Sequence, residues 1–197
     1  MKTLILASSS PSRRAQLAEL KQPFTIQSPD IDETRLPGEG PEALARRLAI
    51  EKAQKIAALN PDAIVIGSDQ VGFCEGRFIE KPITHEKAIA QWEHQSGHIA
   101  RFYTGLCVMG NGETQVSVVL TEIKFKTLTR EAIISYLEKD TPYQCCAGIK
   151  IESHGMDLVE YIQSDDPDAI IGLPLIEVAR MLKNVGIDVQ KRTIRPH

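Results

Sequence analysis

Asp69 combines a carboxylate with a position where α/β proteins often bind ligands. It follows the apolar run of residues 63–67, which is typical of a strand covered on both faces, and Gln70 comes directly after it. Ligands bind at the carboxyl ends of strands in open α/β sheets. A carboxylate at such an end can activate water as a general base or hold Mg²⁺. An ordinary turn aspartate is the alternative interpretation.

Lys52 is a cation on the apolar side of a predicted helix. The pattern of residues 41–59 predicts a helix that stops before Asn60 and Pro61. At about 100° per residue, Lys52 falls in the middle of an apolar stripe made by Leu44, Ala45, Leu48, Ile56 and Leu59. An inward lysine is costly unless an anion meets it, so we expect it to contact a bound triphosphate. If the ammonium is isolated in the free protein, Lys52→Met should keep or raise thermal stability. A lysine that snorkels to solvent is the alternative.

A hydroxyl-rich turn with two arginines links the first predicted strand to the first predicted helix. Ser8 and Ser10 follow the apolar residues 4–7, and Ser12 and Arg13 lie just inside the helix. Helix N-terminal N–H groups bind phosphate, and arginine adds a bidentate fork. The sequence lacks P-loop glycines here, so this is not a Walker motif. Ser10 as a plain N-cap beside solvated arginines is the alternative.

These residues together suit one type of reaction. Arg13, Lys52 and Lys81 are cations that could bind phosphates, whereas Glu33 and Asp69 are carboxylates that could hold a metal ion and activate water. Metal-assisted attack of water on a polyphosphate uses such a set. The five histidines show no metal-ligand spacing. Glu33 sits in an acidic loop, where a merely solvated carboxylate is the alternative.

Composition and charge exclude several other classes of function. The net charge of −3 over 197 residues provides no bulk cationic field for nucleic acid or a membrane surface. No apolar run approaches the roughly 20 residues that span a bilayer, and the apolar run after Met1 is too short for a signal peptide. The four cysteines form no C-x-x-C pair, which favours reduced thiols and a cytoplasmic protein.

The elements that must position these residues alternate between strands and helices. We expect strands at residues 4–7, 24–27, 63–67, 101–109 and 116–127, with a polar loop at 29–40 and hairpin turns at 74–77 and 110–112. We expect helices after the caps Ser10, Thr84 and Thr129, and over residues 41–59 and 174–185. This order predicts an α/β protein with a mixed sheet, in one domain over residues 1–197.

Short motifs along the chain resemble those of the Maf family of nucleoside triphosphate pyrophosphatases. The resemblance runs from Leu4 to about Leu182, and its motifs occur in the family's order. They are L-A-S-S-S-P-S-R at 6–13, D-E at 32–33, R-L-A-I-E-K-A at 47–53, I-G-S-D-Q at 66–70, K-P at 81–82, Y-T-G at 103–105, A-G at 147–148 and G-L-P-L at 172–175.

The resemblance implies a Maf/ITPase-like fold, with a central mixed sheet flanked by helices and a deep nucleotide cleft. It implies hydrolysis of a nucleoside triphosphate to a monophosphate and diphosphate with a divalent cation, Mg²⁺, Mn²⁺ or Co²⁺. Asp69 matches the family's general base, and Glu33 and Asp69 would bind the metal. The substrate contacts it implies lie at Ser8, Ser10, Ser12, Arg13, Glu33, Lys52, Gln70, Lys81 and Glu152.

The residue after the catalytic aspartate indicates the nucleobase of the substrate. In the family, Thr at this position accompanies dTTP and UTP, whereas Gln accompanies 7-methyl-GTP, so Gln70 indicates 7-methyl-GTP. Glu152 aligns with a late carboxylate that reads the base. Two positions depart from this subgroup, because Ser12 replaces its usual Trp and Ile149–Lys150 replace its usual Ser-Phe.

Two alternatives stay open beside this hypothesis of an enzyme that clears modified nucleotides. One is the same chemistry on dTTP and UTP, and the other is a nucleotide-binding regulator of cell division. We expect a nucleoside triphosphate as ligand and neither nucleic acid nor membrane as partner, and we leave a homodimer open.

Overall fold

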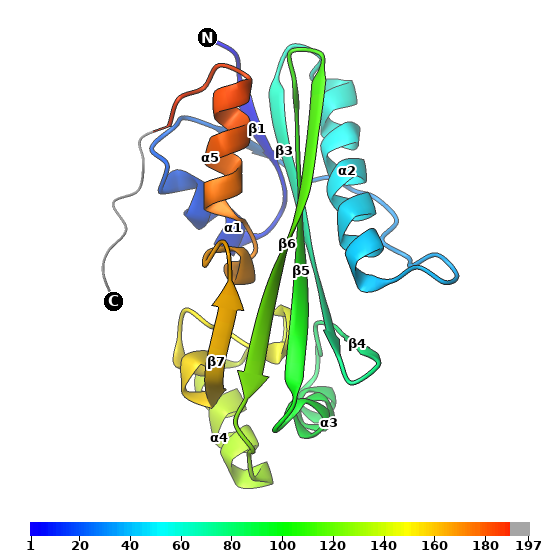
Figure 1. Ribbon diagram of the computed structural model, residues 1–197, viewed down its shortest axis with the longest axis vertical. Helices are drawn as coiled ribbons and strands as arrows, with labels where there is room; N and C mark the ends of the chain where they lie inside the picture. The colour runs from blue at the N-terminus through cyan, green and yellow to red at the C-terminus, as the bar shows by residue number, and fades with distance from the viewer. Residues whose placement is uncertain (190–197) are drawn as a thin grey trace.

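The computed structural model describes residues 1–189, which form one mixed sheet with helices on both faces (Figure 1). The strands are β1 (Leu4–Ala7), β2 (Thr25–Gln27), β3 (Ile64–Cys74), β4 (Arg77–Ile79), β5 (Ile99–Gly110), β6 (Glu113–Phe125) and β7 (Val159–Ser164). They are ordered β2-β1-β3-β5-β6-β7, and β4 also pairs with β3. Strand β1 is parallel to β2 and β3, whereas the pairs from β3 through β5 and β6 to β7 are antiparallel. The predicted mixed sheet is confirmed.

Helices cover the two faces of this sheet unequally. The helices are α1 (Pro11–Ala18), α2 (Pro41–Leu59), α3 (His85–Gln95), α4 (Arg130–Asp140) and α5 (Leu175–Asn184), with short 3₁₀ turns η1 (Cys146–Gly148), η2 (His154–Leu158) and η3 (Ala169–Ile171). Helix α2 packs on one face, and the other helices pack on the opposite face, α1 and α5 at one end and α3 and α4 at the other (Figure 1). None of the helices in residues 1–189 is long and apolar enough to cross a membrane.

The predicted helices and hairpins formed for the local reasons that the sequence indicated. Ser10, Thr84 and Thr129 each cap a helix by accepting a hydrogen bond from a backbone N–H of its first turn. The β5–β6 turn places Asn111 and Gly112 at φ of 55° and 76°, the left-handed pair that a tight hairpin requires. Strand β7 and the three 3₁₀ turns were not predicted.

Two expectations about individual elements were wrong. Strand β3 does not end at Gly67 but continues to Cys74, so Asp69 lies inside a strand rather than in a turn. Asp69 pairs with Gly105 of β5. Because β5 is an antiparallel partner along residues 65–74, it extends β3 beyond the point where β1 ends. Leu59 belongs to the predicted stripe of α2, yet it is 70% exposed because the helix ends at this residue.

Candidate active site

The predicted site lies where one edge of β3 has no strand partner. Strand β1 pairs with β3 only as far as Gly67, and β4 pairs with it from Gly72 onward. Between these pairings, no strand of the described chain covers that edge at residues 68–71. Alternation along the strand directs Asp69 and Gln70 toward opposite faces, and both line the cleft at this gap. Because of this gap, residues 68–71 of β3 are open to a ligand, as residues at the carboxyl end of a parallel strand are.

The cleft has a volume of about 420 Å³ and collects nearly all the predicted residues. Those in its wall are Ser10, Ser12, Arg13, Glu33, Lys52, Asp69, Gln70, Lys81 and Glu152. The remaining wall is largely apolar, with Leu44, Leu48, Phe78, Phe102, Ile149, Ile151, Ile170 and Ile171. A cleft of this size, with an apolar wall and a few convergent charges, is typical of a small-molecule site.

Lys52 joins the two carboxylates of the cleft. Its Nζ lies 2.8 Å from Asp69 Oδ1 and 2.7 Å from Glu33 Oε1. The predicted inward orientation is confirmed, since Lys52 is 9% exposed. The anions that meet its ammonium are two side chains of the protein itself, so Lys52 is not isolated in the free protein.

Close packing of α2 on the sheet brings Lys52 to Asp69. A Cβ on Gly105 would lie 2.3 Å from the carbonyl oxygen of Ala45, and one on Gly67 would lie 2.4 Å from that of Ala49. Only glycine allows the helix backbone to approach β3 and β5 this closely. Because Gly105 is the strand partner of Asp69, the closest approach occurs beside the carboxylate.

Burial and charge act in opposite directions on the ionisable groups of the cleft. Burial raises the pKa of Asp69, although the charges of Lys52 and Arg13 limit the rise. Burial also disfavours ionisation of Glu33, but the hydrogen bond and charge of Lys52, together with Lys81 and Arg13, outweigh it and lower the pKa of Glu33. Desolvation lowers the pKa of Arg13. Asp69 is thus a carboxylate with raised proton affinity next to cations, as a general base requires.

Arg13 is fixed by the backbone of the G-L-P-L segment. Its Nε donates to the carbonyl oxygen of Gly172 at 2.8 Å, which leaves the terminal nitrogens of the guanidinium for the cleft. Gly172 has φ of +136°, and a Cβ there would lie 3.2 Å from Arg13 Nε. The same carbonyl accepts a hydrogen bond from Ser68 Oγ at 3.0 Å. The glycine of this motif therefore positions a phosphate-binding candidate.

Gln70 can use only part of its hydrogen-bonding capacity to bind a ligand, because other residues of the protein occupy its amide nitrogen. Its Nε2 donates to the carbonyl oxygens of Ala169 and Ile170, both at 3.0 Å, and lies 3.2 Å from Thr104 Oγ1. An amide has two N–H donors, so these contacts occupy both of them. Gln70 can thus present only its carbonyl oxygen, an acceptor, to a ligand in the cleft.

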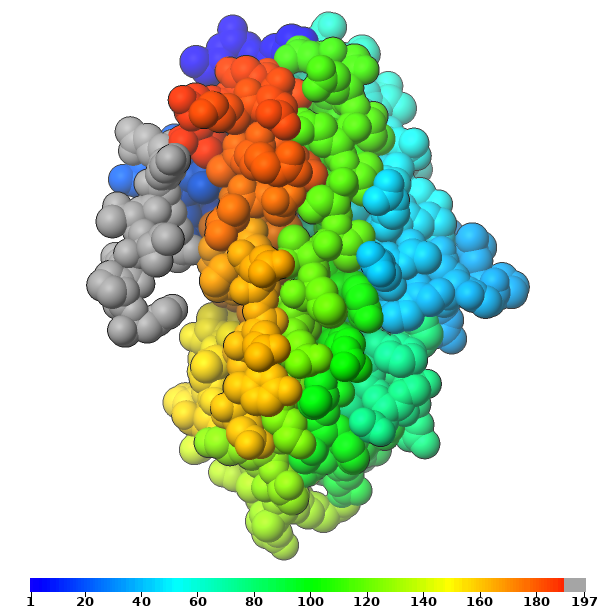
Figure 2. Space-filling model, in the orientation of Figure 1, coloured from blue at the N-terminus to red at the C-terminus, as the bar shows by residue number. Residues whose placement is uncertain are grey.

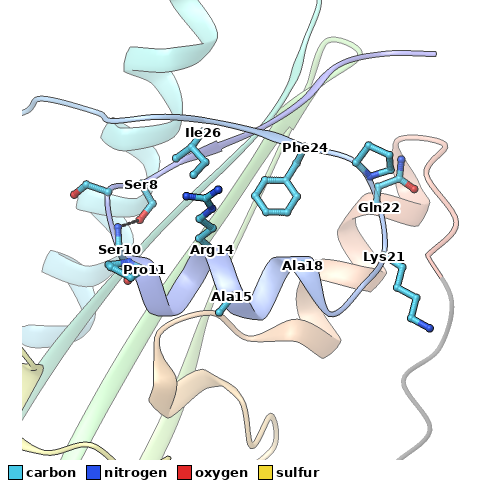
Figure 3. Close-up of a pocket in the computed structure, with 12 residues that line it drawn as sticks. Ser8, Ser10, Pro11, Arg14, Ala15, Ala18, Lys21, Gln22, Phe24 and Ile26 are labelled. Carbon is cyan, nitrogen blue, oxygen red and sulfur yellow. Dashed lines mark hydrogen bonds between the residues drawn. The ribbon is translucent and has the colours of Figure 1, made fainter.

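Ser8 and the second arginine lie outside this cleft. Ser8 Oγ accepts a hydrogen bond from Ser10 N at 3.0 Å and lines a separate pocket of about 810 Å³ beside α1 (Figure 3). Arg14 points into that pocket between Phe24 and Ile26 (Figure 3). No carboxylate lines it, so this pocket lacks the acidic partner that the candidate chemistry requires.

The metal prediction depends on two carboxylates alone. No group of three or more His, Cys, Asp or Glu in residues 1–189 is placed to bind a metal ion. Glu33 and Asp69 lie close together, because both contact one ammonium. Mg²⁺ is commonly held by one or two carboxylates, with water and substrate phosphates completing its shell. The two residues fit such an ion in combination with a bound polyphosphate.

Sequence reasoning assigned no role to Phe78, and it noted Arg47 only as the first residue of the R-L-A-I-E-K-A motif. Arg47 bonds to the loop that carries Glu33, and the Phe78 ring in the cleft wall has the Arg35 guanidinium 3.8 Å above its centroid. On the helical wheel Arg47 is simply a surface residue. Phe78 follows a turn and lacks a periodic signal.

A solved structure shares the fold of this chain. A HAM1 protein from Coxiella burnetii matches with a TM-score of 0.51 at 17% identity, and the match covers 93% of this chain and 100% of that chain. At this identity the likeness concerns the fold alone. It agrees with the predicted mixed sheet flanked by helices.

Curated relatives are much closer in sequence. The 7-methyl-GTP pyrophosphatase of Nitrosococcus oceani is 46% identical over 189 residues, which are 95% of each chain. The 7-methyl-GTP pyrophosphatase of Methylobacillus flagellatus is 46% identical over 191 residues, which are 96% of this chain and 100% of the relative. The family model for Maf-like protein matches residues 3–185. This chain belongs to the Maf family.

Proposed function

We propose that this protein hydrolyses 7-methyl-GTP to 7-methyl-GMP and diphosphate. The observation that carries the proposal is the meeting of Asp69, Glu33 and Lys52 in one cleft with Arg13 and Lys81. The relatives named above support the choice of substrate. The reaction class follows from the site itself, since a buried base beside several cations suits the attack of water on a phosphoanhydride.

In the proposed reaction, Asp69 takes a proton from a water molecule that attacks the α-phosphorus. The bond from this phosphorus to the α–β bridging oxygen breaks, and its electron pair leaves with the diphosphate. Arg13, Lys52 and Lys81 neutralise the charge that develops on the phosphate oxygens. Lys52 then has to share its ammonium between Asp69, Glu33 and the substrate.

Glu33 and Asp69 would hold the divalent cation. Such an ion, when bound, supplies Lewis-acid stabilisation of phosphate oxygens and lowers the pKa of water. The role of the protein is to keep both carboxylates and Lys52 at fixed positions around the phosphates.

The nucleobase of the substrate would contact Gln70 and Glu152. The occupied Nε2 of Gln70 leaves an acceptor, and Glu152 is a second acceptor in the cleft wall. Two acceptors suit guanine N1–H and N2–H₂, and the positive charge of a 7-methylated ring adds attraction to a carboxylate. The rings of Phe78 and Phe102 and several isoleucines supply the apolar surface of the same cleft.

The cellular setting we propose is the cytoplasm, where the enzyme would clear modified nucleotides. All four cysteines are free thiols, as expected for a reducing compartment. Burial raises the pKa of Cys146 in the cleft wall to about 12, so this thiol stays neutral.

The test is diphosphate release from 7-methyl-GTP, GTP, dTTP and UTP in the presence of Mg²⁺, Mn²⁺ or Co²⁺, with wild type and Asp69→Asn side by side. We expect wild-type kcat/KM for 7-methyl-GTP to exceed that for dTTP and UTP at least about tenfold. Asp69→Asn should fold normally and lose about 10²-fold or more in kcat, the scale of a lost general base.

Other outcomes of this test point elsewhere. Faster hydrolysis of dTTP or UTP would favour the pyrimidine alternative. Tight nucleotide binding without diphosphate release in the wild type would favour a regulator. Near-normal turnover by Asp69→Asn would remove this residue from the mechanism.

A further inference from the structure

Arg47 connects α2 to the loop that carries Glu33. Its Nε and Nη2 donate to the two carboxylate oxygens of Glu39 at 2.7 and 2.8 Å. Its Nη2 also donates to the carbonyl oxygen of Thr34 at 3.1 Å, and its Nη1 lies 3.2 Å from both carboxylate oxygens of Glu51. The side chain is 22% exposed, so this guanidinium is largely covered.

Besides the bonds from Arg47, two side chains of the loop of residues 28–40 pack against the rest of the molecule: Arg35 stacks on the Phe78 ring, and Ile31 packs against the apolar cluster at the start of α2. The loop contains no helix or strand, and Figure 2 shows it projecting from the molecule beside the start of α2. Its internal hydrogen bonds are local, from Thr34 N to Asp32 Oδ1 and from Leu36 N to Glu39 Oε1. The ion pair of Glu33 with Lys52 reaches from the loop into the cleft.

The contacts of Arg47 bracket the exposed part of this loop. Thr34 directly follows Glu33, and Glu39 directly precedes Gly40, the N-cap of α2. One guanidinium therefore fixes the chain at two points, five residues apart in sequence. The hydrogen bonds of Arg47, with the backbone bond from Leu36 and the charge of Arg47, lower the pKa of Glu39 to about 2, so the pair stays ionised at neutral pH.

We infer that Arg47 is a positioning residue that holds Glu33 beside Lys52 and Asp69 through the bidentate pair with Glu39 and the bond to Thr34. It does not line the cleft, so it acts on the substrate only through Glu33. The inference rests on the proposed function, because it assigns Arg47 to the same site.

The arginine fork is the feature that matters here. A planar guanidinium can bind a carboxylate with two parallel bonds and still donate elsewhere, whereas a lysine ammonium is a point charge. Loss of the bonds from Arg47 to Glu39 and Thr34 would free Glu33 to move away from the cleft. Misplacing a catalytic group by about 1 Å can reduce the rate about 10²-fold.

The experiment uses two perturbing variants, Arg47→Met and Glu39→Gln, and their double variant. Glu51→Gln is the matched control, because it weakens another contact of Arg47 that does not reach the loop. Hydrogen exchange at residues 28–40 and diphosphate release as a function of Mg²⁺ are measured on each. Glu39→Gln leaves the helix residue in place, so it decides the matter if Arg47→Met fails to fold.

We expect faster exchange in the loop and at least a tenfold lower kcat/KM in both single variants. The double variant should be no worse than Arg47→Met, since the two side chains act as one unit. Glu51→Gln should match the wild type in both readouts. A higher Mg²⁺ requirement should accompany the loss, because Glu33 is one of the two carboxylates available for the ion.

Two results would overturn the inference. One is faster loop exchange with unchanged kcat/KM, which would mean that the position of the loop does not matter to the reaction. The other is unchanged loop exchange, which would mean that Arg47 does not hold the loop. If the wild type releases no diphosphate from any substrate, the proposed function fails, whereas the exchange data still show whether Arg47 and Glu39 order the loop.

Discussion

At the scale of single residues, the ammonium of Lys52 does two things at once. It forms ion pairs with both Asp69 and Glu33 in the free protein, and it lies where it can meet phosphate oxygens. Because Asp69 is buried, removing the cation would leave a carboxylate with little solvent to stabilise its charge. The expectation that Lys52→Met keeps or raises stability assumed an isolated cation, and the two ion pairs overturn that assumption.

Lys52→Met should therefore lower stability at pH 7 by about 1–3 kcal/mol, the cost of leaving a largely buried acceptor without its hydrogen-bond partner. Burial already raises the pKa of Asp69, and without Lys52 the pKa rises further. The penalty relative to wild type is present while Asp69 is ionised in both folded proteins, and it disappears as pH falls below the raised pKa of Asp69 in the folded wild type. Stability that Glu33 gains from its lowered pKa is lost at lower pH, as pH falls from the unfolded value through the lowered folded pKa.

Thermal unfolding of wild type and Lys52→Met between pH 4 and 8 measures this difference. The gap in Tm should narrow toward the acid end. Lys81→Met is the control, because Lys81 lines the same cleft but is exposed. Equal stability of wild type and Lys52→Met at pH 7 would show that the two ion pairs contribute nothing net.

At the scale of elements, the site depends on how closely α2 lies on β3 and β5. A methyl group on Gly105 would lie 2.3 Å from the carbonyl oxygen of Ala45, and backbone cannot yield as a flexible side chain does. Gly105→Ala should move α2 outward, destabilise the protein by about 1–3 kcal/mol as an overpacked substitution, and separate Lys52 from Asp69.

Denaturant unfolding and kcat/KM measured on the same preparation check this prediction. We expect a loss of activity in Gly105→Ala at temperatures where the variant is still folded. Gly40→Ala is the comparison, since nothing lies within 4 Å of its added Cβ and its φ is not positive. A Gly105→Ala protein with wild-type kcat/KM would show that the spacing between α2 and the sheet is not critical.

At the scale of the whole molecule, the proposed recognition of the nucleobase would use segments far apart in sequence. Gln70 on β3 is oriented by carbonyl oxygens of η3, about a hundred residues later. Glu152 lies in a segment that α4 holds at both ends, because Tyr136 Oη accepts from Lys150 N at 2.8 Å and Asp140 Oδ1 accepts from Ser153 Oγ at 2.8 Å. These contacts bring the two acceptors to one cleft.

Glu152→Gln should weaken selection for 7-methyl-GTP because it removes the negative charge but keeps the shape. We expect the preference over UTP to fall from at least about tenfold, or 1.4 kcal/mol of transition-state discrimination, toward parity. Turnover of UTP itself should change little. Competition between the two substrates in one reaction measures the ratio, and Glu160→Gln, an exposed change on β7, serves as control. A preserved ratio in Glu152→Gln would exclude this carboxylate from base selection.

Local chemistry in the sequence was enough to predict most of the elements. Helix α2 begins at Pro41 and ends at Leu59 as expected, and the hydroxyl caps and the tight β5–β6 turn act within a few residues of themselves. The family motifs could be recognised from the order of residues in the sequence. The inward position of Lys52 could be predicted from the period of the helix.

The tertiary structure decided which segments distant in sequence come into contact. Strand β3 extends past Gly67 because β5 pairs with it, and Lys52 finds Asp69 because two glycines let α2 approach the sheet. Arg47 has the pattern of a surface residue, yet it binds a loop with no periodicity of its own. Such contacts depend on distances between segments that are folded together, and a one-dimensional pattern of residue types does not contain those distances.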